Sequence, residues 1–582
     1  MTLKSLSVVV GSIAVLAGAA QAAQSCEALT ITPGSWPDPT MRILSAVAQP
    51  QGFKLATWPI GDSGPLPAHC EVKGVLHERI GRDGEHYAIN FALRLPGNWN
   101  GRFLFEGGGG TDGWVGNAIG QSRGNGPSAL AEGYAVVADD SGHANWINNK
   151  PETGGIMTFG RDPQARADYG HAALKATYDA ARAIIDRFYG HAPNHSYFAG
   201  CSKGGQEAMA FAERYPQAFD GILAGAPGMS LPRAALGHPW SAQVFAAVLG
   251  GGKNKSIPVT KLPESLSDAD LKLARQAVLE ACDADDGLKD GIVGAFGQCS
   301  TAKVHAEFRK VQCQGSKTAS CLSEAQIAAL EKFYEGPKNS KGEALYASFP
   351  WDGGMADGGW RGWTIGTPAG PKVWVAPGTV DPLAAIPPVS VTLGAGSLSE
   401  IFSVPPTVVA SDPQSSFDYL LRFDFDKDAP AIYARNAEFP RSGWDDVNAR
   451  SSDLSGFRAH GGKLIVYHGT ADGIFSINDT TAWWDEVDAR LSGHAADTVR
   501  VFPVPGMGHC MGGLATDQFD PFAALVNWVE HGKAPDRIEA TTNQWSQWPG
   551  RTRPLCAYPA VARYSGKGDS ERAENFVCIK PK

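Results

Sequence analysis

The sequence predicts an α/β fold in which a parallel sheet is interrupted by a large insertion. Over residues 87–225, short apolar segments typical of buried strands alternate with segments of helical periodicity. The alternation stops near Ala226 and resumes after Arg450. A strand, a helix and a strand in this order imply parallel pairing, and one core interrupted by an inserted segment is the simplest account of the gap.

The elements of this core can be taken in chain order. Residues 87–95 alternate as a strand should, whereas most of the other strands are short apolar runs, and the longer helix repeats apolar side chains every three or four residues. The expected elements are strands 87–95, 103–106 and 134–138, helix 171–189, strand 196–199, helix 206–215, and strands 221–225, 463–469 and 499–504.

This pattern and the N-terminal sequence divide the chain into four expected parts. Residues 1–22 are expected to be a signal peptide, residues 23–225 the first part of the core, residues 226–450 an inserted lid, and residues 451–582 the rest of the core. The lid should cover the carboxyl ends of the strands, where ligands of such sheets bind.

The N-terminus has the features of a secretory signal. Lys4 precedes an apolar run from Leu6 to Ala20, and Ala20-Gln21-Ala22 is a small-x-small cleavage site. The alternative is a membrane anchor, but the run is shorter than the ~20 residues that a span needs. The mature protein is therefore expected in the periplasm or outside the cell.

Composition excludes some partners. The net charge is −9 and the pI is about 5.9, which argues against binding to nucleic acid or to anionic membrane surfaces. The 582 residues, 43% of them hydrophobic, suffice for a large core with an insertion. The composition does not predict an oligomeric state.

All ten cysteines lie in the expected mature chain, and an even number in an oxidising compartment predicts five disulfides. The sequence does not fix their connectivity, although proximity favours four pairs and leaves Cys201 and Cys510 for each other. Zinc is the alternative, but the sequence contains no Cys-x-x-Cys. The neighbouring pairs are Cys26–Cys70, Cys282–Cys299, Cys313–Cys321 and Cys556–Cys578.

A nucleophile is predicted at Ser202. The serine lies in Gly200-Cys201-Ser202-Lys203-Gly204, directly after an apolar strand and before a helix. Gly-x-Ser-x-Gly in that context is the nucleophile elbow of an α/β-hydrolase, whose sharp turn needs small residues around the serine. The alternative is a glycine-rich turn with an incidental serine.

Two downstream residues fit the roles of acid and base. Asp472 follows the strand that ends at Gly469, and His509 follows strand 499–504, so the order Ser, Asp, His is the one that this fold requires. Asp479 is a competing acid, although helix capping suits it better. His143 and His468 are rival bases that are expected to be structural.

The oxyanion formed during acyl transfer needs hydrogen-bond donors. The backbone N–H of Lys203, immediately after the nucleophile, is one expected donor. The other should come from the Gly107–Gly110 run that follows strand 103–106, with Gly110 preferred and Gly109 as the second choice. A flexible loop is the alternative interpretation of this run.

A separate site is predicted in the insertion. Residues 283–290 contain four carboxylates, at Asp283, Asp285, Asp286 and Asp290, with glycines for tight turns. Hard oxygen ligands at this spacing suit Ca²⁺, although no glutamate closes an EF-hand loop. The alternative is a solvated acidic turn. A calcium ion here would be structural.

Together these residues resemble the tannase and feruloyl esterase family of α/β-hydrolases over essentially the whole mature chain. The family's Cys-Ser…Asp…His-Cys arrangement is present at Cys201-Ser202, Asp472 and His509-Cys510. The resemblance implies a secreted carboxylic ester hydrolase. It also implies a calcium site with side-chain ligands at three aspartates and carbonyl ligands at two apolar residues. Those ligands are Asp283, Asp286, Asp290, Leu288 and Ile292.

The chain is especially similar to the bacterial mono(2-hydroxyethyl)terephthalate hydrolase branch, in segments 359–363, 422–426, 467–469 and 551–556. That similarity implies that Trp363 and Phe475 contact the substrate ring; ordinary packing is the alternative. In that branch a lid arginine holds the free carboxylate of the substrate. No Lys or Arg occurs here between Lys372 and Arg422, so a charge-assisted bond of about 1.5–3 kcal/mol should be missing.

Hydroxycinnamoyl, galloyl and related benzoyl esters are therefore the expected substrates of a Ser202-His509-Asp472 enzyme. Hydrolysis of the terephthalate monoester is the alternative within the enzymes. A catalytically silent, calcium-stabilised secreted binding protein is the alternative from another class, and the complete set of Ser, His and Asp argues against it.

Overall fold

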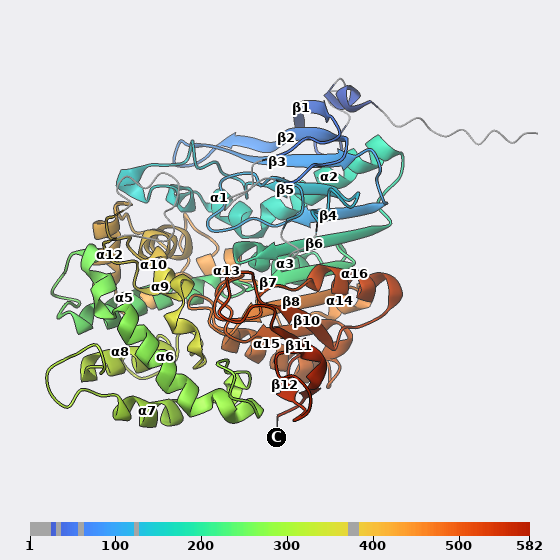
Figure 1. Cartoon of the computed structure of the whole chain (residues 1–582). Helices are drawn as coiled ribbons and strands as arrows, with labels where there is room; N and C mark the ends of the chain where they lie inside the picture. The colour runs from blue at the N-terminus through green and yellow to red at the C-terminus, as the bar shows by residue number, and fades with distance from the viewer. Residues whose placement is uncertain (1–24, 31–35, 56–62, 122–126, 371–382, 582) are drawn as a thin grey trace, which may run out of the picture.

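The computed structural model describes residues 25–30, 36–55, 63–121, 127–370 and 383–581. The predicted signal peptide, residues 1–22, lies outside these ranges. The described chain forms a nine-stranded twisted sheet with helices on both faces, and a helical segment lies to one side of it (Figure 1). No helix in the described ranges is both long and apolar enough to cross a bilayer.

The sheet is mixed, with its antiparallel part at the N-terminal edge. The first three strands and β5 pair antiparallel, whereas β5, β4, β6, β7, β8 and β9 pair parallel in that spatial order. The strands are β1 (Arg42–Gln49), β2 (His69–Ile80), β3 (His86–Pro96), β4 (Arg102–Glu106), β5 (Ala135–Asp139), β6 (His195–Cys201), β7 (Gly221–Gly225), β8 (Lys463–Gly469) and β9 (Val499–Val504).

The predicted α/β-hydrolase class is confirmed, but the parallel pairing inferred from the order of the elements does not extend to the first three strands. β3 is antiparallel to both of its neighbours. A tight turn joins β2 to β3, closed by the Gly81 N–H donating to the Glu85 carbonyl at 2.8 Å. A connection this short permits only antiparallel pairing, because a parallel pair needs a crossover of a dozen or more residues.

Alternate residues of each central strand face opposite layers. Phe105, Phe198 and Ile222 pack in one core with α2 (Ala173–Tyr189), α3 (Lys203–Arg214) and α15 (Ile477–Arg490). Their neighbours Leu104, Tyr197 and Leu223 pack in a second core with α16 (Pro521–His531). Successive side chains of these strands point to opposite faces of the sheet. Because both faces are covered, the central strands are continuous apolar runs in the sequence.

Between β7 and β8 the described chain adds no strand to the sheet. It forms mostly helices with a hydrophobic core of their own, which Ile474 and Phe475 from the loop after β8 and Ile477 from the start of α15 join. In Figure 1 these helices run from green to orange. The longer ones are α5 (Gly237–Val248), α6 (Asp268–Cys282), α7 (Thr301–Lys310), α8 (Glu324–Glu335), α9 (Gly358–Thr364) and α12 (Pro413–Arg422); α13 (Gly443–Val447) and α14 (Ser455–His460) lead back to β8.

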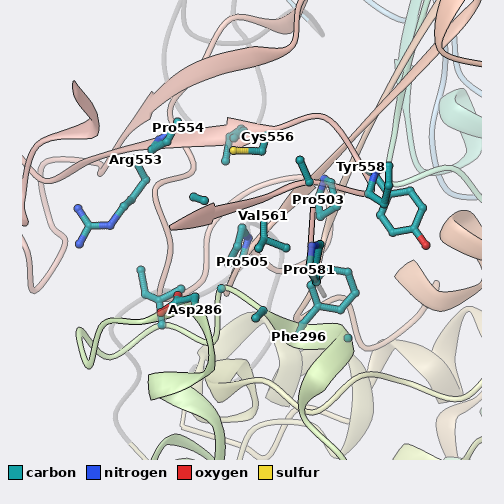
Figure 2. Close-up of a pocket in the computed structure, with 18 of the residues that line it drawn as sticks. Asp286, Phe296, Pro503, Pro505, Arg553, Pro554, Cys556, Tyr558, Val561 and Pro581 are labelled. Carbon is teal, nitrogen blue, oxygen red and sulfur yellow. The ribbon is translucent and has the colours of Figure 1, made fainter. Parts of the chain in front are cut away.

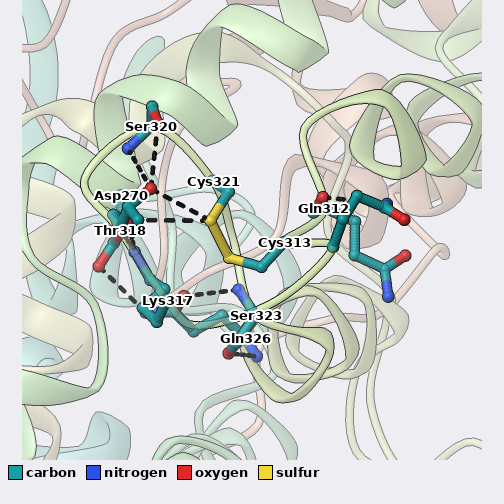
Figure 3. Close-up of a disulfide and its surroundings, with 10 residues drawn as sticks. Asp270, Gln312, Cys313, Lys317, Thr318, Ser320, Cys321, Ser323 and Gln326 are labelled. Atoms are coloured by element: carbon teal, nitrogen blue, oxygen red, sulfur yellow. Dashed lines mark hydrogen bonds and ion pairs between the residues drawn. A yellow bond between two sulfur atoms is a disulfide. The ribbon is translucent and has the colours of Figure 1, made fainter.

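Each of the ten cysteines is paired, in the five combinations favoured above. Five disulfides are consistent with an extracytoplasmic protein. Figure 3 shows the pair Cys313–Cys321, which closes an exposed loop that reaches back to α6 through an ion pair of 2.6 Å between Lys317 and Asp270.

Two small hairpins near the C-terminus were not predicted from the sequence. They are β10 (Arg537–Thr541) with β11 (Thr552–Cys556), and β12 (Val561–Tyr564) with β13 (Phe576–Ile579). β11 reaches the inserted segment, because its Arg553 pairs with Asp290 at 2.5 Å.

Candidate active site

The turn after β6 has the geometry of a nucleophile elbow. Ser202 follows the last residue of β6 with φ +65°, and α3 begins at the next residue, three residues earlier than predicted. A Cβ at Gly200 would lie 2.6 Å from the Gly204 carbonyl oxygen, and one at Gly205 would lie 2.5 Å from the Gly225 carbonyl oxygen. Only glycine fits these positions, so the local sequence places the serine side chain in a sharp turn at the carboxyl end of the parallel strands.

Ser202, His509 and Asp472 form one continuous chain of hydrogen bonds. The Ser202 Oγ lies 2.8 Å from His509 Nε2, and His509 Nδ1 lies 2.7 Å from Asp472 Oδ2. Ser202 and His509 are partly exposed, whereas Asp472 is buried. An accessible hydroxyl, a base within proton-transfer distance and a buried carboxylate that orients the base are the requirements for nucleophilic acyl transfer.

Asp472 is held as a carboxylate by its surroundings. Its Oδ1 accepts the backbone N–H groups of Ile474 at 2.9 Å and Phe475 at 3.1 Å. Burial alone would raise the pKa of Asp472, but His509 and His468 outweigh burial and lower it well below its usual range. The acid therefore stays ionised and can stabilise a protonated His509.

His468, a rival base expected to be structural, supports the loop of the acid, a specific role that the sequence did not indicate. Its buried ring lies with Nε2 3.4 Å from Asp472 Oδ2, and it also contacts the Phe475 carbonyl at 2.9 Å and the Thr480 hydroxyl at 2.8 Å. His468 thus fixes the loop that carries the acid. The available signal was its place at the end of β8, four residues before Asp472.

The other candidates for the acid and the base, Asp479 and His143, lie outside the triad. Asp479 is in the first turn of α15 and pairs with Arg450 at 2.7 Å; the N-cap is Ser476, so the capping role expected for Asp479 was wrong. His143 is buried and stacks on Phe159 with 3.7 Å between ring centroids. Burial lowers the pKa of His143 to about 3, so its ring is neutral and packs as an aromatic side chain.

The disulfide Cys201–Cys510 joins the residue before the serine to the residue after the histidine. Its Cα atoms lie 6.0 Å apart although 309 residues separate the two cysteines along the chain. The base is thereby tied to the nucleophile by a covalent bond as well as by a hydrogen bond. The inserted segment lies entirely within the loop that this bond closes.

Two backbone N–H groups lie beside the elbow and could donate hydrogen bonds to a substrate. Within the described ranges, the N–H groups of Gly110 and Lys203 donate no hydrogen bond. Gly110 has φ +64°, which suits glycine, and the Gly109 N–H is already bonded to Asp112 Oδ2 at 3.0 Å. Gly110 is therefore available for an oxyanion, and the second choice, Gly109, is not.

The aromatic residues expected at the substrate flank the base. Trp363 packs edge-on against the His509 ring with centroids 5.4 Å apart, and Phe475 does so at 5.2 Å. Arg361, the basic residue nearest to Trp363 in sequence, is buried and donates to the Leu266 carbonyl at 2.7 Å and the Pro263 carbonyl at 2.8 Å. These bonds make Arg361 unsuitable as a clamp for a substrate carboxylate.

The acidic loop in the insertion brings several partly buried carboxylates close together. Burial first, and then Asp290 and Asp283, raise the pKa of Asp286 to about 7. Asp290 pairs with Arg553, and the Ile292 carbonyl accepts the Gly294 N–H at 3.1 Å. No group of three or more His, Cys, Asp or Glu side chains in the described part of the chain is arranged to hold a metal ion. The carboxylate and carbonyl oxygens of this loop are of the kind that a hard cation binds. They are not arranged around one point, however, so binding would need the loop to rearrange.

A cavity of about 400 Å³ lies beside this loop, between residues 286–298 and the C-terminal strands (Figure 2). Its walls are mostly apolar, and of its charged residues Asp286, Asp290 and Arg553 the last two are paired with each other. The described lining residues include none of Ser202, Asp472 and His509, so this cavity is not the place of acyl transfer.

Comparison with known proteins places these features in a family. A model of the family described as tannase and feruloyl esterase matches residues 70–579. The mono(2-hydroxyethyl) terephthalate hydrolase of Piscinibacter sakaiensis is 41% identical over 580 residues, covering 96% of this chain and 92% of its own. The feruloyl esterase B structure from Aspergillus oryzae superposes with TM-score 0.72 at 21% identity, covering 95% of this chain and 99% of its own. The tannin acyl hydrolase of Aspergillus niger superposes with TM-score 0.66 at 19% identity, covering 94% and 93%.

Proposed function

Because the chain belongs to the tannase and feruloyl esterase family and is a carboxylic ester hydrolase, we propose that it cleaves aromatic esters through an acyl-enzyme formed on Ser202. The observation that carries the proposal is the unbroken chain of hydrogen bonds from Ser202 Oγ through His509 to Asp472.

In the proposed reaction, each step has a candidate residue of this chain. His509 Nε2 takes the hydroxyl proton as Ser202 Oγ attacks the ester carbonyl carbon, and the resulting oxyanion accepts the N–H groups of Gly110 and Lys203. His509 then gives the proton to the departing alkoxide, which leaves as the alcohol. Water repeats the sequence on the acyl-enzyme, with His509 as its base, and the free acid and Ser202 are regenerated.

Two observations support neutral aromatic acyl groups as the substrates. Trp363 and Phe475 bring aromatic rings next to His509, where a planar acyl group would pack against them. No basic residue occurs between Lys372 and Arg422, and the buried Arg361 directs Nη1 and Nη2 to backbone carbonyls. A free carboxylate on the substrate would therefore lack a cationic partner. Cleavage of the terephthalate monoester, the activity named for the bacterial relative, is the second candidate.

A substrate panel tests this preference. We expect kcat/KM for methyl ferulate or methyl gallate to exceed that for mono(2-hydroxyethyl) terephthalate, because only the monoester carries an uncompensated carboxylate. The control is the neutral methyl ester of that same monoester, which should recover the activity if charge is the cause. A tenfold advantage for the monoester, about 1.4 kcal/mol in transition-state stabilisation, would contradict the proposal.

We also propose that Asp283, Asp286 and Asp290, with the carbonyls of Leu288 and Ile292, bind a structural calcium ion. The four carboxylates in residues 283–290 support this, since a divalent cation would compensate their charge; burial, and then Asp290 and Asp283, raise the pKa of Asp286. The ion would hold the loop that contacts β11 through Asp290 and Arg553. It would supply no step of the ester chemistry.

Removal of calcium should lower the melting temperature while leaving kcat little changed below the transition. An ion at a hundred times its Kd stabilises the fold by about 2.7 kcal/mol. Calorimetry with and without a chelator, together with elemental analysis, measures this. Asp286→Asn should abolish the calcium dependence, whereas Asp285→Asn should retain it, because Asp285 faces Lys303 at 2.9 Å. Metal-free protein with an unchanged melting temperature would refute the site.

Finally, we propose a periplasmic or extracellular location. The five disulfides support it, since such bonds persist in oxidising compartments. Fractionation of cells that express the full chain would test it.

A further inference from the structure

A cluster of buried charges lies directly beneath the nucleophile elbow. The side chains of Lys203, Glu207 and Asp112 are each about 1% exposed. Lys203 Nζ lies 2.7 Å from Glu207 Oε1 and 3.4 Å from Asp112 Oδ1. Lys203 is the residue after the nucleophile, yet its ammonium group points into the protein.

Aromatic and acidic neighbours hold this ammonium group in place. Lys203 Nζ lies 4.5 Å from the centre of the Tyr169 ring, a cation–π distance. Burial alone would lower the pKa of Lys203, but Asp112 and Glu207 outweigh it and raise the pKa above its ordinary value. The lysine is therefore charged, and removing one partner from such a cluster would leave a buried charge without compensation.

The same side chains hold the glycine loop that supplies the second oxyanion donor. Glu207 Oε2 accepts the Gly108 N–H at 3.0 Å, and Asp112 Oδ2 accepts the Gly109 N–H at 3.0 Å. The Tyr169 hydroxyl donates to the Gly110 carbonyl at 3.4 Å. Three successive glycines are thus fixed by three members of one cluster.

This loop has no side chains of its own to hold it. A Cβ at Gly108 would lie 1.8 Å from Asp112 Oδ2, and one at Gly204 would lie 2.7 Å from the Gly108 carbonyl oxygen. The loop therefore approaches the acid at Gly108, and the elbow at Gly204, too closely for any residue but glycine at these two positions. Its position depends on the hydrogen bonds that the cluster provides.

We propose that Lys203, Glu207, Asp112 and Tyr169 are positioning residues for the oxyanion hole. Lys203 supplies one donor through its backbone N–H. Through its side chain it anchors Glu207 and Asp112, which hold residues 108–109 so that the Gly110 N–H faces the same oxyanion. The inference rests on the proposed function, because it presumes that the oxyanion forms beside Ser202.

Glu207→Gln is the first test. The Glu207 carboxylate accepts from Gly108 N–H, Lys203 Nζ and the Ser141 hydroxyl, whereas an amide has one acceptor oxygen and must turn its NH₂ group toward one of these donors. We expect kcat to fall about 10- to 100-fold with KM little changed, because the lost alignment matters mainly in the transition state. Tyr169→Phe, which keeps the ring, should lower kcat by a smaller factor.

Glu530→Gln is the matched control. Glu530 also accepts from three donors, the Arg102 Nε at 2.7 Å, the Arg102 Nη2 at 2.6 Å and the Tyr197 hydroxyl at 2.7 Å. It lies on α16, near the first residue of β4 and so at the opposite end of that strand from the glycine loop. This variant should lose stability but keep kcat.

Inhibitor binding separates positioning from stability. An aryl boronic acid forms a tetrahedral adduct with Ser202 that needs both donors, so its affinity for Glu207→Gln should fall with kcat/KM. Affinity for the planar product acid should stay unchanged. Wild-type kcat and boronate affinity in both Glu207→Gln and Tyr169→Phe would overturn the proposal, as would equal losses in Glu530→Gln. If Glu207→Gln does not fold, the same comparison is made between Tyr169→Phe and Tyr197→Phe.

Labelling with a fluorophosphonate shows whether a negative result contradicts only the positioning role or the proposed function as well. A wild-type protein labelled at Ser202 together with unaffected variants would overturn only the positioning role. A wild-type protein that is not labelled at Ser202 would overturn the proposed function and this inference with it.

Discussion

Replacing Ser202 with alanine should abolish ester hydrolysis while the protein folds normally. The expected loss of kcat is about five to six orders of magnitude, because the members of a catalytic triad act as a unit and only the oxyanion hole and substrate binding remain. The φ of +65° at this position is uncommon for any residue with a Cβ, so alanine in place of serine adds no new steric conflict of the backbone. The missing hydroxyl is partly exposed and bonds to His509, so its removal leaves no buried group unsatisfied.

Steady-state kinetics on a neutral aromatic ester, with a melting curve for each protein, would measure this. A phosphonate label on Ser202 should be recovered from the wild-type protein and be absent from Ser202→Ala. Ser416→Ala is a suitable control, since Ser416 is buried in the inserted segment and its hydroxyl donates to the Ala410 carbonyl, far from the triad in sequence. Turnover near the wild-type rate in Ser202→Ala would remove Ser202 as the nucleophile.

The sequence predicted the central part of the fold because the central strands are buried on both faces. Strands such as β6 and β8 read as apolar runs for that reason. β1 could not be found in this way. It is an edge strand with a mostly exposed face, and its apolar residues Leu44 and Val47 are 57% and 49% exposed. No burial pattern marks such a strand, and only its pairing with β2 defines it.

The triad residues could be predicted because each one follows a predicted strand, in the order that the fold requires. Contacts between segments far apart along the chain could not be predicted from the sequence. The preference for Gly110 over Gly109 depends on Asp112, and the anchoring of Gly108 depends on Glu207, about a hundred residues away. Likewise, Asp290 is paired with an arginine 263 residues later in the chain. The spacing of residues along the chain carries no information about such contacts, because they depend on how distant segments pack together.

Removing the disulfide beside the triad should have the second large effect. The double variant Cys201→Ala with Cys510→Ala should lose about 3–5 kcal/mol of stability, because the bond closes a loop of 309 residues and so restricts the unfolded chain. It should also lose activity at temperatures where it remains folded. Cys510 has φ +66° and directly follows His509, so without the bond the loop that carries the base can move relative to Ser202.

The matched control is the double variant Cys313→Ala with Cys321→Ala, which opens a loop of only eight residues on the surface. It should lose less stability, since the entropic effect of a disulfide grows with the loop it closes, and its kcat should not change. Mass spectrometry of an unreduced digest of the wild-type protein should recover one peptide pair that contains Cys201 and Cys510. Free thiols at these positions, or equal kinetic effects of the two double variants, would show that the bond does not position the base. Ser202 would then depend on its hydrogen bond to His509 alone.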